Sequence, residues 1–200
     1  MEKEKKKSIL KKAIVIVSIL ALLLLVFFGS GLYMRLFTPN NYMIKAENTI
    51  DYQPHYECSG YSSAYVLRSL GKKADGMEVY EQISNKNPDG TVPVETLVTF
   101  LREQGYKATE KSGTVWNLKN EVSKGVPVIV FVRTYPDAAN YHYLPIVGYD
   151  EEYFYAADSL SNMKNADEQY YNRKISIADF ENMWTTGITK DNTYIIMRLK

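Results

Sequence analysis

The chain has 200 residues, and because single domains cluster at about 100–150 residues, it holds one domain with at most a short additional segment. Its 24 basic and 23 acidic residues nearly cancel, but residues 36–200 alone carry a net charge of −4, so nucleic acid is not an expected partner. One Cys and two His exclude a disulfide framework and a cysteine-rich zinc site, and we expect no metal or cofactor.

The first predicted element is an uncharged, apolar run over residues 13–34. As a helix its 22 residues extend about 33 Å, enough to cross a hydrocarbon core of about 30 Å, so we expect a transmembrane signal anchor. A cleaved secretory signal is the alternative, but its apolar stretch is normally about 7–15 residues and ends at a small-residue cleavage site.

Positive charges lie mainly on one side of this run. Six lysines precede it within a basic tail, residues 1–12, whereas only Arg35 follows closely. Because basic residues stay on the cytoplasmic side of a membrane, we expect a single-pass protein of the cell membrane with a cytoplasmic amino terminus and an extracellular carboxy-terminal domain. Residues 35–50 are predicted to form a linker, and residues 51–200 to form the soluble domain.

Helices are predicted in the first half of this domain. The first begins at Cys58, shows apolar residues at helical spacing and stops before Gly71. The same criteria predict helices over residues 77–83, 93–104 and 116–125.

Strands follow. Residues 126–132 form a continuous β-branched run, which is typical of a strand buried on both faces. Residues 143–149 and 153–157 are predicted to pair as a hairpin. A helix that begins after Ser176 and a strand over residues 194–199 complete the domain. Helices followed by antiparallel strands indicate an α+β fold.

The predicted hairpin brings a histidine and a carboxylate together. With its turn near residue 150, His142 lies beside Asp158, or one position from it, on the neighbouring strand. A carboxylate that accepts a hydrogen bond from one imidazole nitrogen fixes the tautomer and leaves the other nitrogen to accept a proton. A purely structural hydrogen bond is the alternative interpretation.

Cys58 is expected at a helix start, where the helix dipole and unpaired backbone N–H groups stabilise a thiolate. A lone cysteine is more often an inert, buried side chain. This cysteine is unpaired in a domain expected outside the cell, and it lies at a helix start instead of in mid-core. Those features favour a nucleophile.

Taken in order, these residues resemble the papain-like cysteine peptidases. The resemblance is carried by QPHYECSGY at residues 53–61, GVPVIV at 125–130, HYLPIVGY at 142–149 and the later Asp158. Among the papain-like peptidases the pattern is most similar to the thirty-ninth cysteine-peptidase family, which contains bacteriocin-processing, double-glycine-leader peptidases and their stand-alone relatives.

The resemblance implies a papain-like fold, in which a helical part with Cys58 at a helix amino terminus packs on an antiparallel sheet that carries His142 and Asp158. It further implies that Cys58 is the nucleophile and His142 the general base and later acid. Asp158 would orient His142, and Gln53 would donate to the oxyanion. Two departures are visible: Gln53 stands slightly closer to Cys58 than in most members, and Ser59 follows the cysteine where many members have glycine.

The expected activity is that of a membrane-anchored cysteine peptidase, which hydrolyses a peptide bond of a peptide or protein substrate through a thioester acyl-enzyme. The sequence contains no Gly-rich phosphate loop, so ATP is not an expected partner, and leader cleavage coupled to export is not carried over. Two alternatives stay open. One is a non-catalytic papain-like module that binds peptides, and the other is a cell-wall peptide hydrolase with the same Cys–His chemistry.

Overall fold

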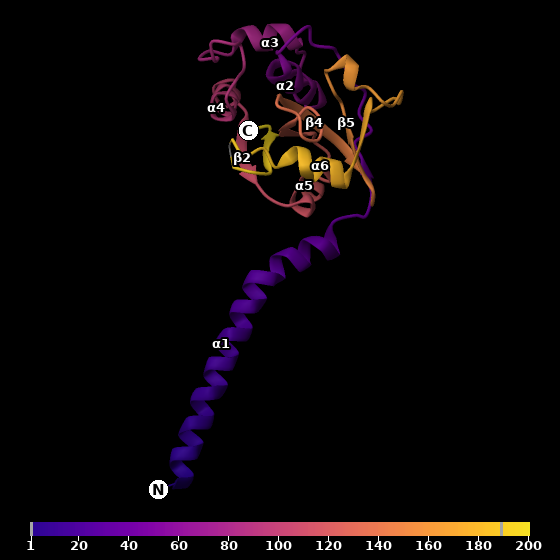
Figure 1. The fold of residues 1–200 in the computed structure, drawn as a ribbon. Coiled ribbons are helices and arrows are strands. Elements are labelled where there is room, and N and C mark those ends of the chain that lie inside the picture. Colours follow the sequence, from indigo (N-terminus) through magenta and orange to yellow (C-terminus); the bar gives the residue numbers. More distant parts are fainter. Residues whose placement is uncertain (1, 189) are drawn as a thin grey trace. The chain divides into compact units, whose positions relative to one another are not determined.

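The computed structural model describes residues 2–188 and 190–200, without the side chains of residues 2–5, 8–10, 21–30 and 32. It contains two compact units, of which the first ends at Thr38 and the second is Pro39–Lys200. The first unit is a single helix, α1 (Glu2–Phe37), drawn in indigo and violet in Figure 1.

A transmembrane anchor was expected over residues 13–34. These residues are helical, as part of α1, but no helix in the part of the chain that the structure describes is both long enough and apolar enough to span a membrane. Half of the side chains of the expected anchor, those of residues 21–30 and 32, lie outside the described residues.

The second unit has the expected α+β architecture, with a seven-stranded sheet in which every pairing is antiparallel. The helices are α2 (Cys58–Ser69), α3 (Gly76–Gln82), α4 (Val94–Glu103), α5 (Val115–Val122), α6 (Ile177–Trp184) and the 3-10 turn η1 (Ser161–Met163). The strands are β1 (Tyr42–Met43), β2 (Lys107–Ser112), β3 (Val128–Arg133), β4 (Tyr141–Tyr149), β5 (Tyr153–Ala156), β6 (Arg173–Ser176) and β7 (Thr193–Arg198). Their order is β2-β7-β3-β4-β5-β6, and β1 pairs with β4.

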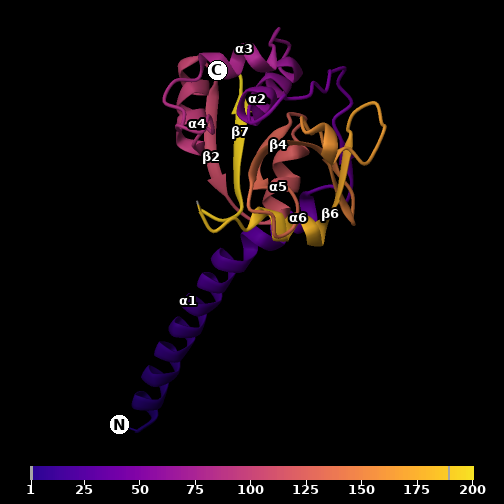
Figure 2. The ribbon, with the colours of Figure 1, turned by 45° about the horizontal axis from the view of Figure 1, so that its top comes forward.

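Both faces of the sheet are covered. Ile129 and Phe131 of β3 join one core cluster with α2, α3 and α4, whereas Val128, Val130 and Val132 join a second cluster with α5 and α6. Figure 1 shows α2 and α3 above β4 and α5 and α6 below it, and Figure 2 shows α4 beside β2. Because successive side chains of a strand point to opposite faces, the β-branched run of β3 is apolar throughout, as predicted.

Several boundaries differ from those predicted. Strand β4 begins at Tyr141, two residues earlier than expected, so His142 is a strand residue, and β5 ends at Ala156. Within residues 35–50, the expected linker, β1 pairs with β4 and Ile44 is buried. The sequence did not predict β2 or β6, because both are edge strands with few apolar side chains and so show no clear alternation.

Close contact between α2 and α3 depends on Gly60. A Cβ atom at position 60 would lie 2.4 Å from the carbonyl oxygen of Gly76 and 2.4 Å from the Cβ of Tyr80. Backbone atoms cannot move aside cheaply, so we expect Gly60→Ala to lower the free energy of unfolding by about 1–3 kcal/mol, as measured by urea denaturation. The control is Gly31→Ala, since a Cβ there would meet nothing within 4 Å. Equal midpoints for the two variants would contradict this account.

Candidate active site

Cys58 is the first residue of α2, as the sequence predicted, and it is half-buried. Its Sγ atom lies 3.9 Å from the carbonyl oxygen of Tyr56. One turn further along α2, the buried hydroxyl of Ser62 donates a hydrogen bond of 2.7 Å to the carbonyl oxygen of Tyr143. Because Tyr143 follows His142 on β4, this bond fixes the start of the helix against the strand that carries the histidine.

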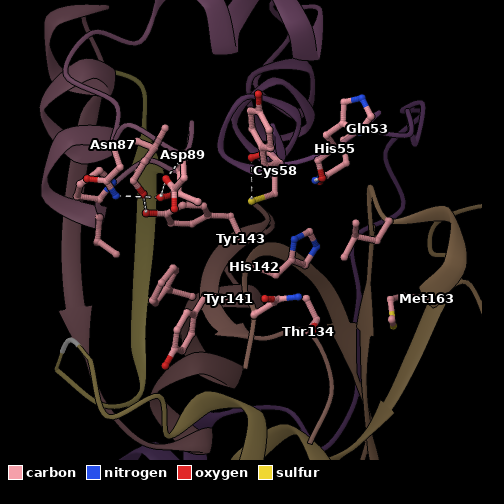
Figure 3. Close-up of a pocket in the computed structure, with 18 of the residues that line it drawn as sticks. Gln53, His55, Cys58, Asn87, Asp89, Thr134, Tyr141, His142, Tyr143 and Met163 are labelled. Atoms are coloured by element: carbon pink, nitrogen blue, oxygen red, sulfur yellow. Dashed lines mark hydrogen bonds between the residues drawn. The ribbon is translucent and has the colours of Figure 1, made fainter. Parts of the chain in front are cut away.

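His142 is fully buried in β4, and its ring faces the cysteine. Its Nε2 atom lies 2.8 Å from Oδ1 of Asp158, so Nδ1 is the nitrogen left for Cys58. Figure 3 shows the Cys58 sulfur directed toward the His142 ring. Burial acts to lower the pKa of His142, but the charge and hydrogen bond of Asp158, together with Cys58, raise it to about 9.

Asp158 is completely buried in the loop that follows β5, not on the strand itself. The predicted contact with His142 is present, but the register differs. Ile146 pairs with Ala156, and a bulge shifts the pairing before Tyr149 meets Phe154. Asp158 therefore reaches His142 from beyond the end of the hairpin.

A set of polar groups that the sequence analysis missed surrounds Asp158. Its Oδ1 also accepts a hydrogen bond of 2.8 Å from the backbone N–H of Leu160, and its Oδ2 accepts one of 2.7 Å from Arg173. The Asn172 side chain bonds to both the N–H and the C=O of Asp158. Burial acts to raise the pKa of Asp158, but His142 and Arg173 outweigh it, and the pKa is lowered.

Gln53 lies beside the loop that follows Asp158. Its Oε1 accepts a hydrogen bond of 2.6 Å from Ser159, its backbone N–H donates to the Ser159 carbonyl, and its Nε2 donates one of 2.8 Å to the carbonyl oxygen of His55. An amide nitrogen carries two hydrogens, so one N–H of Gln53 is left for a further acceptor. His55, the other histidine, is exposed.

Gln53, Cys58 and His142 line one cavity of about 770 Å³. Its walls also include five aromatic side chains and residues from the segment before α4 and from around η1. The aromatic residues are Tyr56, Phe131, Tyr135, Tyr141 and Tyr143. A largely apolar cavity with a few polar groups is typical of a ligand site, and this one is large enough for several residues of a peptide. Among the residues described, no group of three or more His, Cys, Asp or Glu side chains is placed to hold a metal ion.

The sequence model of the Peptidase_C39 like family matches residues 41–188. The chain belongs to this family. The match covers most of Pro39–Lys200, including Cys58, His142 and Asp158, and it confirms the resemblance drawn from the sequence. No curated protein sequence matches the chain.

Solved structures of C39 peptidases share the fold. A putative C39-like peptidase from Bacillus anthracis superposes with a TM-score of 0.61 at 19% identity, covering 79% of this chain and 98% of that one. The peptidase domain of Streptococcus ComA, a bi-functional ABC transporter, superposes with a TM-score of 0.60 at 15% identity, covering 78% of this chain and all of that one. A double glycine motif protease from an AMS/PCAT transporter, in complex with the leader peptide, superposes with a TM-score of 0.56 at 17% identity, covering 79% of this chain and 94% of that one. The C39 peptidase fold is therefore that of Pro39–Lys200.

Proposed function

We propose that this chain is a cysteine peptidase that hydrolyses a peptide bond of a peptide or protein substrate. Membership of the C39-like family and the peptidase domains among its structural neighbours support the reaction class. The observation that carries the proposal is the juxtaposition of three groups. The Cys58 sulfur at a helix start faces the His142 ring, whose second nitrogen is 2.8 Å from buried Asp158.

In the proposed mechanism, the Cys58 thiol gives its proton to Nδ1 of His142, and the thiolate attacks the carbonyl carbon of the scissile bond. The tetrahedral oxyanion accepts hydrogen bonds from the backbone N–H of Cys58 and from the remaining Nε2–H of Gln53. The C–N bond breaks as His142 gives its proton to the leaving amine, which leaves a thioester on Cys58. A water molecule then attacks the thioester carbonyl while His142 takes a proton from the water, the C–S bond breaks and releases the acid product, and His142 returns the proton to the Cys58 sulfur.

The first test is the reactivity of the thiol, because Cys58 is the only cysteine of the chain. We expect iodoacetamide at neutral pH to label the full chain faster than it labels free cysteine. Cys58→Ala should show no labelling, and His142→Ala should be labelled more slowly. Labelling no faster than that of a free thiol would favour the alternative of a non-catalytic peptide-binding module.

The second test is cleavage. The unmodified chain and Cys58→Ala are incubated with unfolded proteins and, separately, with purified cell-wall peptides, and the products are identified by mass spectrometry. Cleavage of unfolded protein that depends on Cys58 is the expected result. Cleavage of wall peptides alone would support the alternative of a cell-wall peptide hydrolase.

Gln53 provides a further prediction. We expect Gln53→Ala to lower kcat/KM by about 10²–10³-fold, because an oxyanion donor contributes about 3–4 kcal/mol to the barrier in related chemistry. Ser159→Ala is the matched control, since it removes only the hydrogen bond to Oε1 and leaves the amide N–H in place. If Ser159→Ala and Gln53→Ala lower the rate equally, Gln53 only shapes the loop.

We also propose that residues 13–34 anchor the chain in the cell membrane with the peptidase domain outside. The support comes from the sequence, in the uncharged run and the lysines that precede it. A reporter that is active only outside the cytoplasm, fused after Lys200, should give a signal. Signal from a cytoplasmic reporter at the same position would contradict this orientation.

A further inference from the structure

We propose that Arg173 is a positioning residue of the active site, which clamps Asp158 in the place from which the carboxylate orients His142. The proposal rests on the function proposed above. Arg173 is the first residue of β6, two positions along the sheet from the strand that carries His142, and it belongs to none of the sequence motifs.

Two contacts fix the Arg173 side chain. One terminal nitrogen donates a hydrogen bond of 2.7 Å to Oδ2 of Asp158, and the other donates one of 2.6 Å to the carbonyl oxygen of Thr134. Only 5% of Arg173 is exposed. The planar guanidinium holds its donors in a fixed fork. The Thr134 carbonyl oxygen therefore fixes the orientation of Arg173, and Arg173 in turn fixes the position of the Asp158 carboxylate.

The two oxygens of Asp158 have separate partners. Oδ1 accepts from His142 and Leu160, whereas Arg173 is the partner of Oδ2. A buried carboxylate oxygen without a donor is costly. Without Arg173, the carboxylate would rotate or take up a proton, and either change weakens its hold on His142.

Charge balance points the same way. With a neutral thiol and a neutral imidazole, the cluster of Cys58, His142, Asp158 and Arg173 holds one positive and one negative charge. After proton transfer from Cys58 to His142 it holds two of each. Arg173 therefore keeps the cluster neutral on both sides of the transfer, which limits the cost of placing these charges in a buried site.

The experiment follows the charge of His142 through the thiol. Iodoacetate and iodoacetamide both react with the thiolate, so the rate with iodoacetate divided by the rate with iodoacetamide does not depend on the fraction of thiolate. Iodoacetate is an anion, so the positive charge of a protonated His142 attracts it and raises this ratio. In the unmodified full chain we expect the ratio to fall with a midpoint near pH 9.

Three other ionisable groups in this region have pKa values shifted away from pH 9. The pKa values of Tyr80 and Tyr143 are raised from 10, mainly by burial, and hydrogen bonds from Thr91 lower the pKa of Asp89. His55 lines the same cavity, so the ratio is also measured in His55→Gln.

Loss of the positive charge of Arg173 would by itself raise the pKa of His142, but we expect the displacement of Asp158 to outweigh it. Arg173→Met should therefore lower the midpoint by about one pH unit, in the same direction as Asp158→Asn, for which we expect about 1–3 units. Because Arg173 acts through Asp158, Arg173→Met should lower the midpoint no further when Asp158→Asn is already present. Arg173→Lys keeps the buried charge but cannot span both acceptors, so its midpoint should lie between those of Arg173→Met and the unmodified chain. It supplies the test if Arg173→Met does not fold.

The outcomes separate the two proposals. A midpoint that is unchanged or higher in both Arg173 variants would overturn the role of Arg173. So would a fall caused by Arg173→Met that is equally large in the unmodified chain and in Asp158→Asn. An unmodified chain whose thiol reacts no faster than free cysteine would overturn the proposed function.

Discussion

Replacing His142 by alanine should lower kcat/KM for peptide hydrolysis by about 10⁴-fold. Without the imidazole, no group takes the proton from Cys58, and none returns it to the leaving amine. The measurement is the rate at which the variant and the unmodified chain cleave the same peptide at neutral pH. The peptide is one that the cleavage test described above identifies as a substrate.

The matched control is His55→Ala, which changes the only other histidine. His55 also lines the cavity, but it forms hydrogen bonds through its backbone. Its carbonyl oxygen accepts from Gln53, and its N–H donates to Glu57. We expect this variant to retain activity within a few-fold. Comparable losses in the two variants would show that His142 is not the base.

The second large effect is on stability. The pKa of His142 is raised from 6.5 to about 9, with Asp158 as the main cause opposing burial. A raised pKa in the folded state means that the folded chain binds the proton more tightly than the unfolded chain. The stabilisation is thus complete below pH 6.5 and is lost as the pH rises through 9. For this fully buried group the loss amounts to about 3 kcal/mol.

Urea denaturation between pH 6 and pH 9.5 measures this loss. The free energy of unfolding of Cys58→Ala, in which no thiol can supply the proton, should decrease over that range. The decrease should be about 3 kcal/mol smaller when His142→Gln, which cannot take up a proton there, is added. Parallel pH profiles for the two proteins would show that His142 does not hold an extra proton in the folded state.

Features that depend on neighbouring residues could be predicted from the sequence. A helix start at Cys58, the cap at Ser176 and the β-branched run of β3 are local signals, and the structure contains all three. The hairpin also placed His142 near Asp158 correctly, because a short turn restricts which residues can face one another. The family followed from the order of these motifs along the chain.

The contacts that hold the site together could not be predicted in this way, because they join residues that are distant in the sequence. The bulge in β4 and the end of β5 at Ala156 put Asp158 in a loop, so its partners do not follow from strand alternation. Arg173 lies on an edge strand with little apolar pattern, and nothing near it in the sequence marks it as a partner of Asp158. Such contacts depend on where a loop folds back in space and on which buried charges need compensation, and neither is encoded in residue spacing.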